Sequence, residues 1–184
     1  FQVSAFEGHV RREHWPAFQS RVLRNTERLL EVFARFGAAT GGYCFGWLGD
    51  RIGRSRAMSA SILMYSGMAA VTGLAQSPPQ FWIAWFLACT GVGGMWPNGV
   101  ALLAEAWSGL SRPALAGVIG TAANIGIFVF STVGTVIRIT PDSWRWVMLV
   151  GAAPVVLGVL SLFIVPESPR WLASQIAPPS PAVK

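Results

Sequence analysis

The side chains that could do chemistry lie in three short charged clusters. The first holds an acid and two bases within five residues, and each of the other two holds an acid followed by an arginine. Their members are Asp50, Arg51, Arg54, Glu105, Arg112, Glu167 and Arg170. Such groups form ion pairs and charge-assisted hydrogen bonds. The sequence shows no paired carboxylates, no nucleophile beside a base and no phosphate-binding loop. It therefore predicts a protein that is not an enzyme and that uses no cofactor or metal.

Long apolar segments separate these clusters and must position them. The chain is 53% hydrophobic and only 12% charged, which is about half the charged fraction of soluble domains. Apolar segments of about twenty residues cross a bilayer as helices. We therefore expect an all-α integral membrane bundle with the lipid bilayer as its solvent. The expected spans cover about residues 29–49, 57–75, 81–103, 114–137 and 144–165.

The polar segments between the spans fix the expected orientation. Arginine outnumbers acid in the loop at 50–56, which places this loop and the loop at 104–113 on the cytoplasmic side. The polar stretch 1–28 then lies outside, and the Pro-rich and Ser-rich residues 173–184 are expected to be a disordered tail or linker. Basic residues are scattered over loops, so no nucleic-acid partner is expected. The chain begins with Phe1, so we expect a piece of a longer protein.

Five residues define the most specific motif. Gly46, Asp50, Arg51, Gly53 and Arg54 form the pattern Gly, three residues, Asp-Arg, one residue, Gly-Arg. Between two apolar segments, this pattern resembles the loop between the second and third spans of major facilitator superfamily transporters. The resemblance covers roughly residues 30–172 and implies spans two to six of the N-terminal six-helix half of that fold. The first span and the C-terminal half of the same protein are thus expected partners. The alternative is an ordinary hairpin loop that only obeys the positive-inside rule.

Two further motifs point to particular branches of this superfamily. Glu105, six residues and Arg112 resemble the acid–base pair between spans four and five of sugar porters and organic-ion transporters. The segment 166–172, with Glu167 and Arg170, resembles the segment after their sixth span. The resemblance implies a cytoplasmic salt-bridge network that holds the two halves closed in the outward-facing state. The alternative is that these charges only fix topology and solubility.

The fourth expected span narrows the solute class. Thr90 to Pro97 resembles the fourth span of metabolite–proton symporters, including the aromatic-acid branch, and Asn124 to Gly126 also resembles that branch. Two residues depart from it: Trp85 stands where the branch has an intramembrane Arg, and Met95 where it has an acid. These departures argue against proton coupling through this half. The Gln expected of sugar porters falls on Gly120, which makes a sugar less favoured.

Four polar side chains lie nearest to the apolar spans and are candidate substrate ligands. Arg35, beside Glu31, could meet an anion, while Asn98 and Asn124 could donate hydrogen bonds to it. Glu31 and Arg35 could instead form an i,i+4 pair on an external extension of the helix. The two asparagines could instead join neighbouring helices.

These observations predict a fragment of a secondary transporter that moves a small organic solute, preferably an organic anion, by alternating access. Its expected location is the cell membrane, as in the inner membrane of a bacterium. A carrier similar to the sugar porters is one alternative. Another is a receptor or assembly protein that has the facilitator fold but transports nothing.

Overall fold

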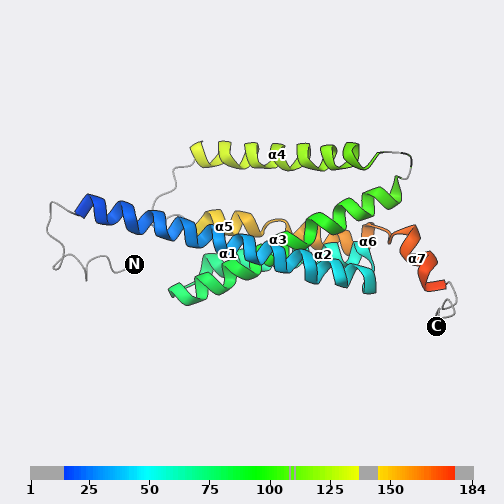
Figure 1. The fold of residues 1–184 in the computed structure, drawn as a ribbon, viewed down its shortest axis with the longest axis horizontal. Coiled ribbons are helices and arrows are strands. Elements are labelled where there is room, and N and C mark those ends of the chain that lie inside the picture. The colour runs from blue at the N-terminus through cyan, green and yellow to red at the C-terminus, as the bar shows by residue number, and fades with distance from the viewer. Residues whose placement is uncertain (1–14, 108, 110, 137–144, 177–184) are drawn as a thin grey trace, which may run out of the picture.

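The computed structural model describes residues 15–107, 109, 111–136 and 145–176, and within them every regular element is a helix. Most of the helices lie along one long axis (Figure 1). The prediction of an all-α fold is confirmed. The helices are α1 (Trp15–Ile52), α2 (Arg54–Leu74), α3 (Pro78–Ala106), α4 (Arg112–Val136), α5 (Arg145–Ala152), α6 (Val155–Ile164) and α7 (Pro169–Ile176).

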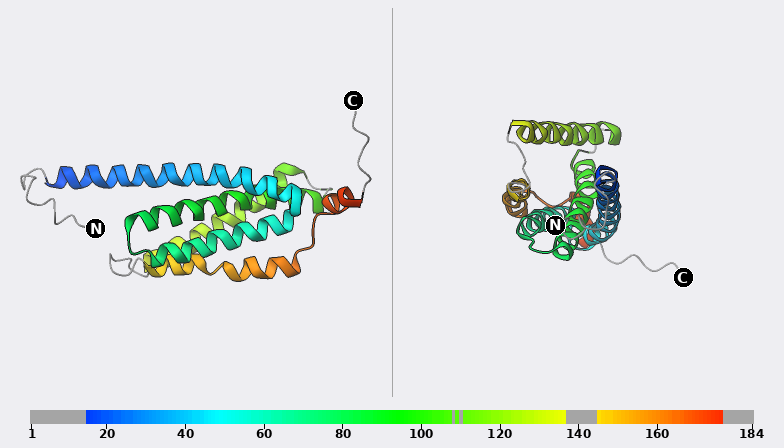
Figure 2. Two further views of the ribbon diagram at one scale, coloured as in Figure 1. Left: turned by 90° about the horizontal axis from the view of Figure 1, so that it is seen from below. Right: turned by 90° about the vertical axis from the view of Figure 1, so that its left-hand side faces the viewer.

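Helices α1, α2 and α3 pack side by side through small residues (Figures 1 and 2). A Cβ atom on Gly37 of α1 would lie 2.8 Å from the carbonyl oxygen of Phe86 in α3. A Cβ atom on Gly91 of α3 would lie 2.9 Å from the carbonyl oxygen of Ser61 in α2. Any side chain at either position would push the helices apart. In a bilayer, close contact of this kind is a main source of attraction between helices.

Helices α5 and α6 form one interrupted span along the outer side of α2. The stretch Arg145–Ile164 is apolar enough to cross a membrane, but the helix stops at Ala152 and resumes at Val155. Pro154 lies in the gap, where it offers no N–H for a helical hydrogen bond. Gly158 then brings α6 close to α2, because a Cβ atom there would lie 3.0 Å from the side chains of Ile62 and Leu63.

Helix α4 stands apart from the other helices and contacts α3 (Figures 1 and 2). Leu115, in its first turn, is buried, whereas Ile125 and Phe128 in its middle are exposed. Its exposed side chains are largely apolar, so they suit contact with lipid tails or with further transmembrane helices.

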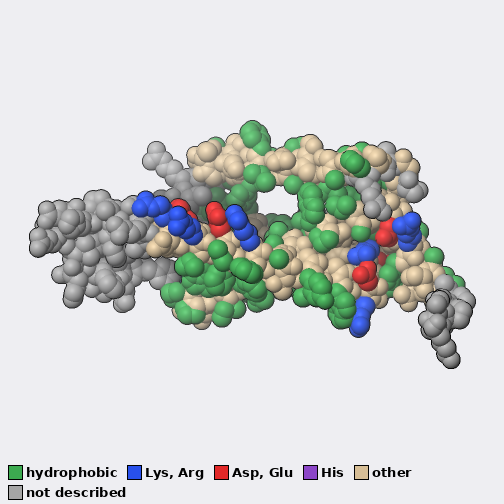
Figure 3. All heavy atoms as spheres, in the orientation of Figure 1, with side chains coloured by type: hydrophobic (Ala, Val, Ile, Leu, Met, Phe, Trp, Pro, Cys, Tyr) green, Lys and Arg blue, Asp and Glu red, His purple; other side chains and the backbone are tan. Residues whose placement is uncertain are grey.

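Four helical stretches of the described chain are long and apolar enough to cross a membrane. Charged side chains on the face drawn in Figure 3 form two groups at opposite ends of the long axis, with apolar side chains between them. This distribution is expected of a bundle that spans a bilayer. The four apolar stretches are Arg54–Leu74, Pro78–Ala106, Pro113–Val136 and Arg145–Ile164. Helix α1, which contains the predicted span 29–49, is not among them.

Several boundaries differ from those expected from composition. The expected loop at 50–56 shrinks to Gly53, because helical structure continues through the charged residues on both sides. The expected loop at 104–113 begins only after Ala106. Helix α7 includes residues 173–176, which composition assigned to a disordered tail, because Ser168 and Pro169 form a helix start. Helix α1 begins at Trp15, inside the stretch expected to be polar and non-spanning. Residues 1–14 and 177–184 lie outside the described chain.

Candidate functional site

Residues from all three charged motifs meet at one end of the bundle, where α1 passes into α2 (Figure 1). The end of α3 and the segment between α6 and α7 contact this junction. We call this group the junction cluster. Its members are Gly49, Asp50, Gly53, Arg54, Asn98, Glu105, Glu167 and Ser168.

Gly53 makes the turn between α1 and α2. Its φ of 108° lies in a region that L side chains rarely adopt, and it is the one residue with positive φ in the described chain. The turn keeps its backbone hydrogen bonds, since Gly53 N–H donates to Gly49 at 3.2 Å and Ala57 N–H donates to Gly53 at 3.1 Å. A Cβ atom here would lie 2.6 Å from Oε1 of Glu167. Glycine is thus required both for the turn and for the space.

The carboxylate of Glu167 caps the N-terminus of α2. The backbone N–H of Ser55 donates to Oε2 at 3.1 Å, and that of Arg56 donates to Oε1 at 3.0 Å. The first N–H groups of a helix lack helical partners and carry partial positive charge, so an anion there is stabilising. The side chain of Glu167 is only 11% exposed, which strengthens these bonds. Ser55 adds a bond from its hydroxyl to the Val165 carbonyl, at 2.9 Å.

Asp50 and Arg54 form an ion pair across the turn, with 2.6 Å between Oδ1 and Nη2. Asp50 is 67% exposed and Arg54 is 23% exposed. Because solvent screens the aspartate, the pair contributes little to stability by itself. Asp50 therefore keeps an accessible carboxylate at the edge of the cluster.

Ser168 joins α7 to α3. Its hydroxyl donates to Oε2 of Glu105 and accepts a hydrogen bond from the Trp171 N–H at 3.3 Å. Ser168 is therefore the N-cap of α7, and Pro169 follows it at the first helical position. The indole N–H of Trp171 donates to the Asp50 carbonyl oxygen at 3.2 Å. These contacts hold α7 against the junction of α1 and α2.

Asn98, a predicted substrate ligand, is completely buried in α3. Its Nδ2 group donates to the carbonyl oxygens of Phe45 and Gly94, each at 2.9 Å. Its Oδ1 atom accepts a bond from Nη1 of Arg54 at 3.4 Å. These bonds use the amide on both sides, so the structure favours the alternative in which Asn98 joins helices.

The other residues of the expected gate take up different positions. The guanidinium of Arg51 lies 4.1 Å above the ring of Trp47, which is cation–π geometry. A Cβ atom on Gly46 would meet no atom within 4 Å. Arg170 is exposed, and no ion pair inside the described chain includes it. The side chain of Arg112 lies outside the description, so its pairing with Glu105 stays a prediction.

The remaining candidate substrate ligands do not converge. Glu31 and Arg35 pair with each other at 3.4 Å on the exposed surface of α1. Asn124 lies on α4, where its Nδ2 group donates to the Gly120 carbonyl at 2.8 Å. The Glu31–Arg35 geometry fits the i,i+4 alternative.

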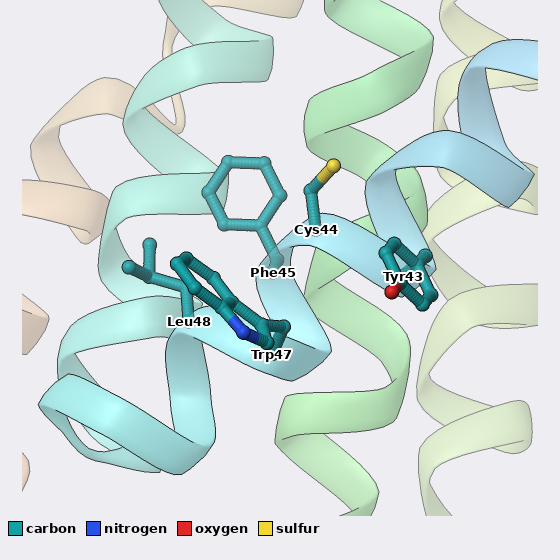
Figure 4. A pocket seen from close by; sticks show the side chains of 5 residues that line it. All are labelled: Tyr43, Cys44, Phe45, Trp47 and Leu48. Carbon is teal, nitrogen blue, oxygen red and sulfur yellow. The ribbon is translucent and has the colours of Figure 1, made fainter.

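An apolar hollow of about 340 Å³ lies on α1 near Tyr43, Cys44, Phe45, Trp47 and Leu48 (Figure 4). Phe45 points into the bundle and is buried, whereas Tyr43 and Trp47 are exposed. A Cβ atom on Gly94 would lie 2.5 Å from Cβ of Phe45, so Gly94 makes room for this ring. The hollow offers contact area and few polar partners.

The cluster can form and break ion pairs and hydrogen bonds, but it contains no group set up for covalent chemistry. In the described chain, no three His, Cys, Asp or Glu side chains are grouped so that they could hold a metal. Sequence reasoning assigned no role to Gly49, Ser55, Ser168 and Trp171. Ser168 and Trp171 lie inside the segment 166–172 that it singled out, and Ser168-Pro169 is also a helix-start signal.

The sequence of this chain is similar to those of known membrane transport proteins. Residues 32–183 match the sequence profile of the Major Facilitator Superfamily. The cis,cis-muconate transport protein of Acinetobacter baylyi is 33% identical over 82% of this chain and 36% of its own length. The inner membrane metabolite transport protein YgcS of Escherichia coli is 32% identical over 77% of this chain and 32% of its own. Solute carrier family 22 member 7 of Sus scrofa is 31% identical over 83% of this chain and 27% of its own.

Solved structures support the fold. The inward-open xylose transporter XylE from E. coli superposes with a TM-score of 0.64 at 23% identity, covering 80% of this chain and 39% of its own. A double-Trp variant of XylE gives a TM-score of 0.67 at 24% identity, covering 83% of this chain and 37% of its own. The chain thus spans about a third of the length of the curated relatives named above.

Proposed function

Because this chain belongs to the Major Facilitator Superfamily, we propose that it forms part of a secondary transporter that moves a small organic anion by alternating access. The similarity to the cis,cis-muconate transport protein supports the choice of an organic anion. The likeness to XylE is below 25% identity and speaks for the fold alone. In this proposal the complete carrier consists of this chain, a first span and a second half.

The junction cluster supplies the gate of this carrier. The observation that carries the proposal is the cap that Glu167 places on α2 from a segment more than a hundred residues later. Polar contacts of this kind join separate segments, yet water can replace them when they separate. A transport cycle needs contacts that are stable in one state and absent in the other. We assign this role to Glu167, Ser168 and the Asp50–Arg54 pair.

The exposed carboxylate of Asp50 lies where a second half could pair with it. An i,i+4 partner leaves much of the aspartate open to solvent. The pair thus has capacity for a further donor, from Arg112 or from the missing half. The proposed gate would close on the cytoplasmic side, and the membrane would be the inner membrane of a bacterium. The cytoplasmic side rests on the surplus of arginine at the junction, and the inner membrane rests on the similarity to the inner membrane metabolite transport protein YgcS.

The solute path is proposed to pass the exposed faces of α1 and α4. The hollow beside Tyr43 and Trp47 provides an apolar wall of the kind that contacts the body of an organic acid. Arg35 and Asn124 remain the proposed polar partners for the carboxylates. Their separation in this chain requires that the missing helices complete the site.

Uptake measurements test this function. The complete carrier would be reconstituted in liposomes and offered radiolabelled cis,cis-muconate, benzoate and xylose, with and without an imposed proton gradient. Saturable uptake of an acid but not of xylose supports the proposal. Uptake of xylose instead would make it a sugar carrier. A folded carrier that takes up none of them contradicts the proposal and favours a receptor or assembly protein.

Asp50→Asn tests the gate in the same liposomes. The substitution keeps the size of the side chain and removes its charge, so we expect slower transport with little change in stability. Coupling of this kind corresponds to about 1–3 kcal/mol. Glu27→Gln, on the exposed surface of α1 far from the junction, is the matched control. Equal uptake by the wild type and Asp50→Asn contradicts the assigned role.

A further inference from the structure

Asn98 is a fully buried polar residue in a transmembrane helix, and it touches three helices. It lies on α3, donates to Phe45 of α1 and accepts from Arg54 of α2. A buried amide is costly unless its donors and acceptor are all used. In Asn98 both the Nδ2 group and the Oδ1 atom are hydrogen-bonded. Of the three partner residues, Phe45 and Arg54 belong to other helices and Gly94 belongs to α3 itself.

The orientation of the amide follows from its partners. Both partners of Nδ2 are carbonyl oxygens, which can only accept, and the partner of Oδ1 is a guanidinium, which can only donate. Turning the amide by 180° would place donors against Arg54 and an acceptor against two carbonyls. One orientation therefore satisfies every contact.

Gly49 provides the space for this arrangement. A Cβ atom on Gly49 would overlap Oδ1 of Asn98 and would lie 3.2 Å from Nη1 of Arg54. The contact between Asn98 and Arg54 therefore depends on the absence of a side chain at position 49. Three residues from three helices are fitted to one another at this point.

Pro97 immediately precedes Asn98 inside α3. A proline in a helix removes one backbone hydrogen bond and allows a bend. A bend at Pro97 would move Asn98 relative to Phe45 and Arg54. The amide of Asn98 thus connects the shape of α3 to the position of Arg54.

We propose that Asn98 is a positioning residue of the gate, which acts by holding Arg54 beside Asp50 and thereby links α3 to the α1–α2 junction. The role of Asn98 in a transport gate rests on the proposed function. The claim that Asn98 holds Arg54 in place can be tested without any transport measurement. The predicted role as a substrate ligand is replaced by this one.

The test uses Ser55 as a reporter, because Ser55 is buried under the cap made by Glu167. The full 184-residue chain carrying Ser55→Cys, Cys44→Ser and Cys89→Ala would be placed in lipid nanodiscs. The rate of reaction with a water-soluble maleimide then measures how often the junction opens. Asn98→Leu should raise this rate about fivefold or more, in the range of typical coupling effects.

Two variants separate positioning from simple packing. Asn98→Asp keeps an acceptor for Arg54, so its rate should stay below that of Asn98→Leu. Gly49→Ala should raise the rate when Asn98 is present, because the new methyl group displaces the amide. It should have an effect of less than about twofold when combined with Asn98→Ala, since the overlapping oxygen is then absent. Gly67→Ala, whose Cβ would meet no atom within 4 Å, is the control and should change nothing.

The outcomes are distinct. Equal rates for the reporter chain and Asn98→Leu overturn the inference, as do equal rates for Asn98→Leu and Asn98→Asp. Additive effects of Gly49→Ala and Asn98→Ala also overturn it. If the labelling results appear as expected while the complete carrier moves no solute, the proposed function fails and the positioning role of Asn98 remains.

Discussion

The carboxylate of Glu167 occupies the space that a side chain on Gly53 would need. The same carboxylate accepts two backbone N–H bonds from the first turn of α2. The turn and its cap are therefore one arrangement, in which a glycine and an acid far apart in the sequence require each other. Four predictions concern this end of the bundle and its orientation.

Gly53→Ala should destabilise the chain strongly. Alanine is strained at a φ of 108°, and its methyl group would displace the carboxylate of Glu167 from the helix end. Strain of this kind costs about 1–3 kcal/mol. Unfolding in a detergent titration measures the change. Gly67→Ala, in open space on α2, is the control, and equal losses for the two variants would contradict the prediction.

Glu167→Gln should loosen the N-terminus of α2 without a change in side-chain size. Glutamine keeps one acceptor oxygen but loses the negative charge that the helix end favours. We expect a loss of about 1–2 kcal/mol in unfolding free energy and faster maleimide labelling of Ser55→Cys. Glu31→Gln removes an exposed acid elsewhere and serves as the control. An unchanged labelling rate for Glu167→Gln would show that the carboxylate does not act as a cap.

Ser168→Ala should release α7 from α3. The substitution removes the N-cap of α7 and leaves Glu105 without the hydroxyl donor. Loss of a cap and of a charge-assisted bond should lower the unfolding free energy by about 1–3 kcal/mol. Ser174→Ala also removes one hydroxyl bond in α7, but on the exposed surface, and should cost much less. Similar losses in the two variants would argue against the contact with Glu105.

The orientation can be checked with single cysteines in a background without Cys44 and Cys89. Gln76→Cys lies in the turn before α3, and Gln175→Cys lies in α7 at the opposite end; both residues are exposed. In intact cells, an impermeant maleimide should label Gln76→Cys only, because we propose from its surplus of arginine that the junction faces the cytoplasm. Labelling of Gln175→Cys from outside would reverse the assignment.

The part of the junction cluster formed by residues 49–54 was accessible from sequence, because these residues are close together along the chain. The spacing of Gly46, Asp50, Gly53 and Arg54 located the turn, and the superfamily resemblance that this spacing suggested is confirmed. Four of the five apolar segments coincide with helical stretches that are long and apolar enough to cross a membrane, whereas α1, which contains the predicted span 29–49, is not among these stretches. Charge and hydrophobicity are local properties, so they can be read without a structure.

The contacts between distant segments could not be obtained in this way. Nothing local in Glu167 indicates which helix N-terminus it caps, because that choice depends on how α6 packs against α2. Asn98 illustrates the same limit, since its depth in the membrane fits a substrate ligand and an interhelical bond equally well. Only the positions of Phe45 and Arg54 distinguish the two.

The junction between α1 and α2 consists of the single residue Gly53. Consecutive Cα atoms are about 3.8 Å apart, so the facing ends of α1 and α2 cannot move far from each other. Any opening of the junction must therefore be a change of angle at Gly53, while larger displacements are taken up elsewhere, at the break beside Pro154 or in the connection from α3 to α4. For protein engineering, an epitope tag should be tolerated near Gly109 and should disrupt folding at position 53.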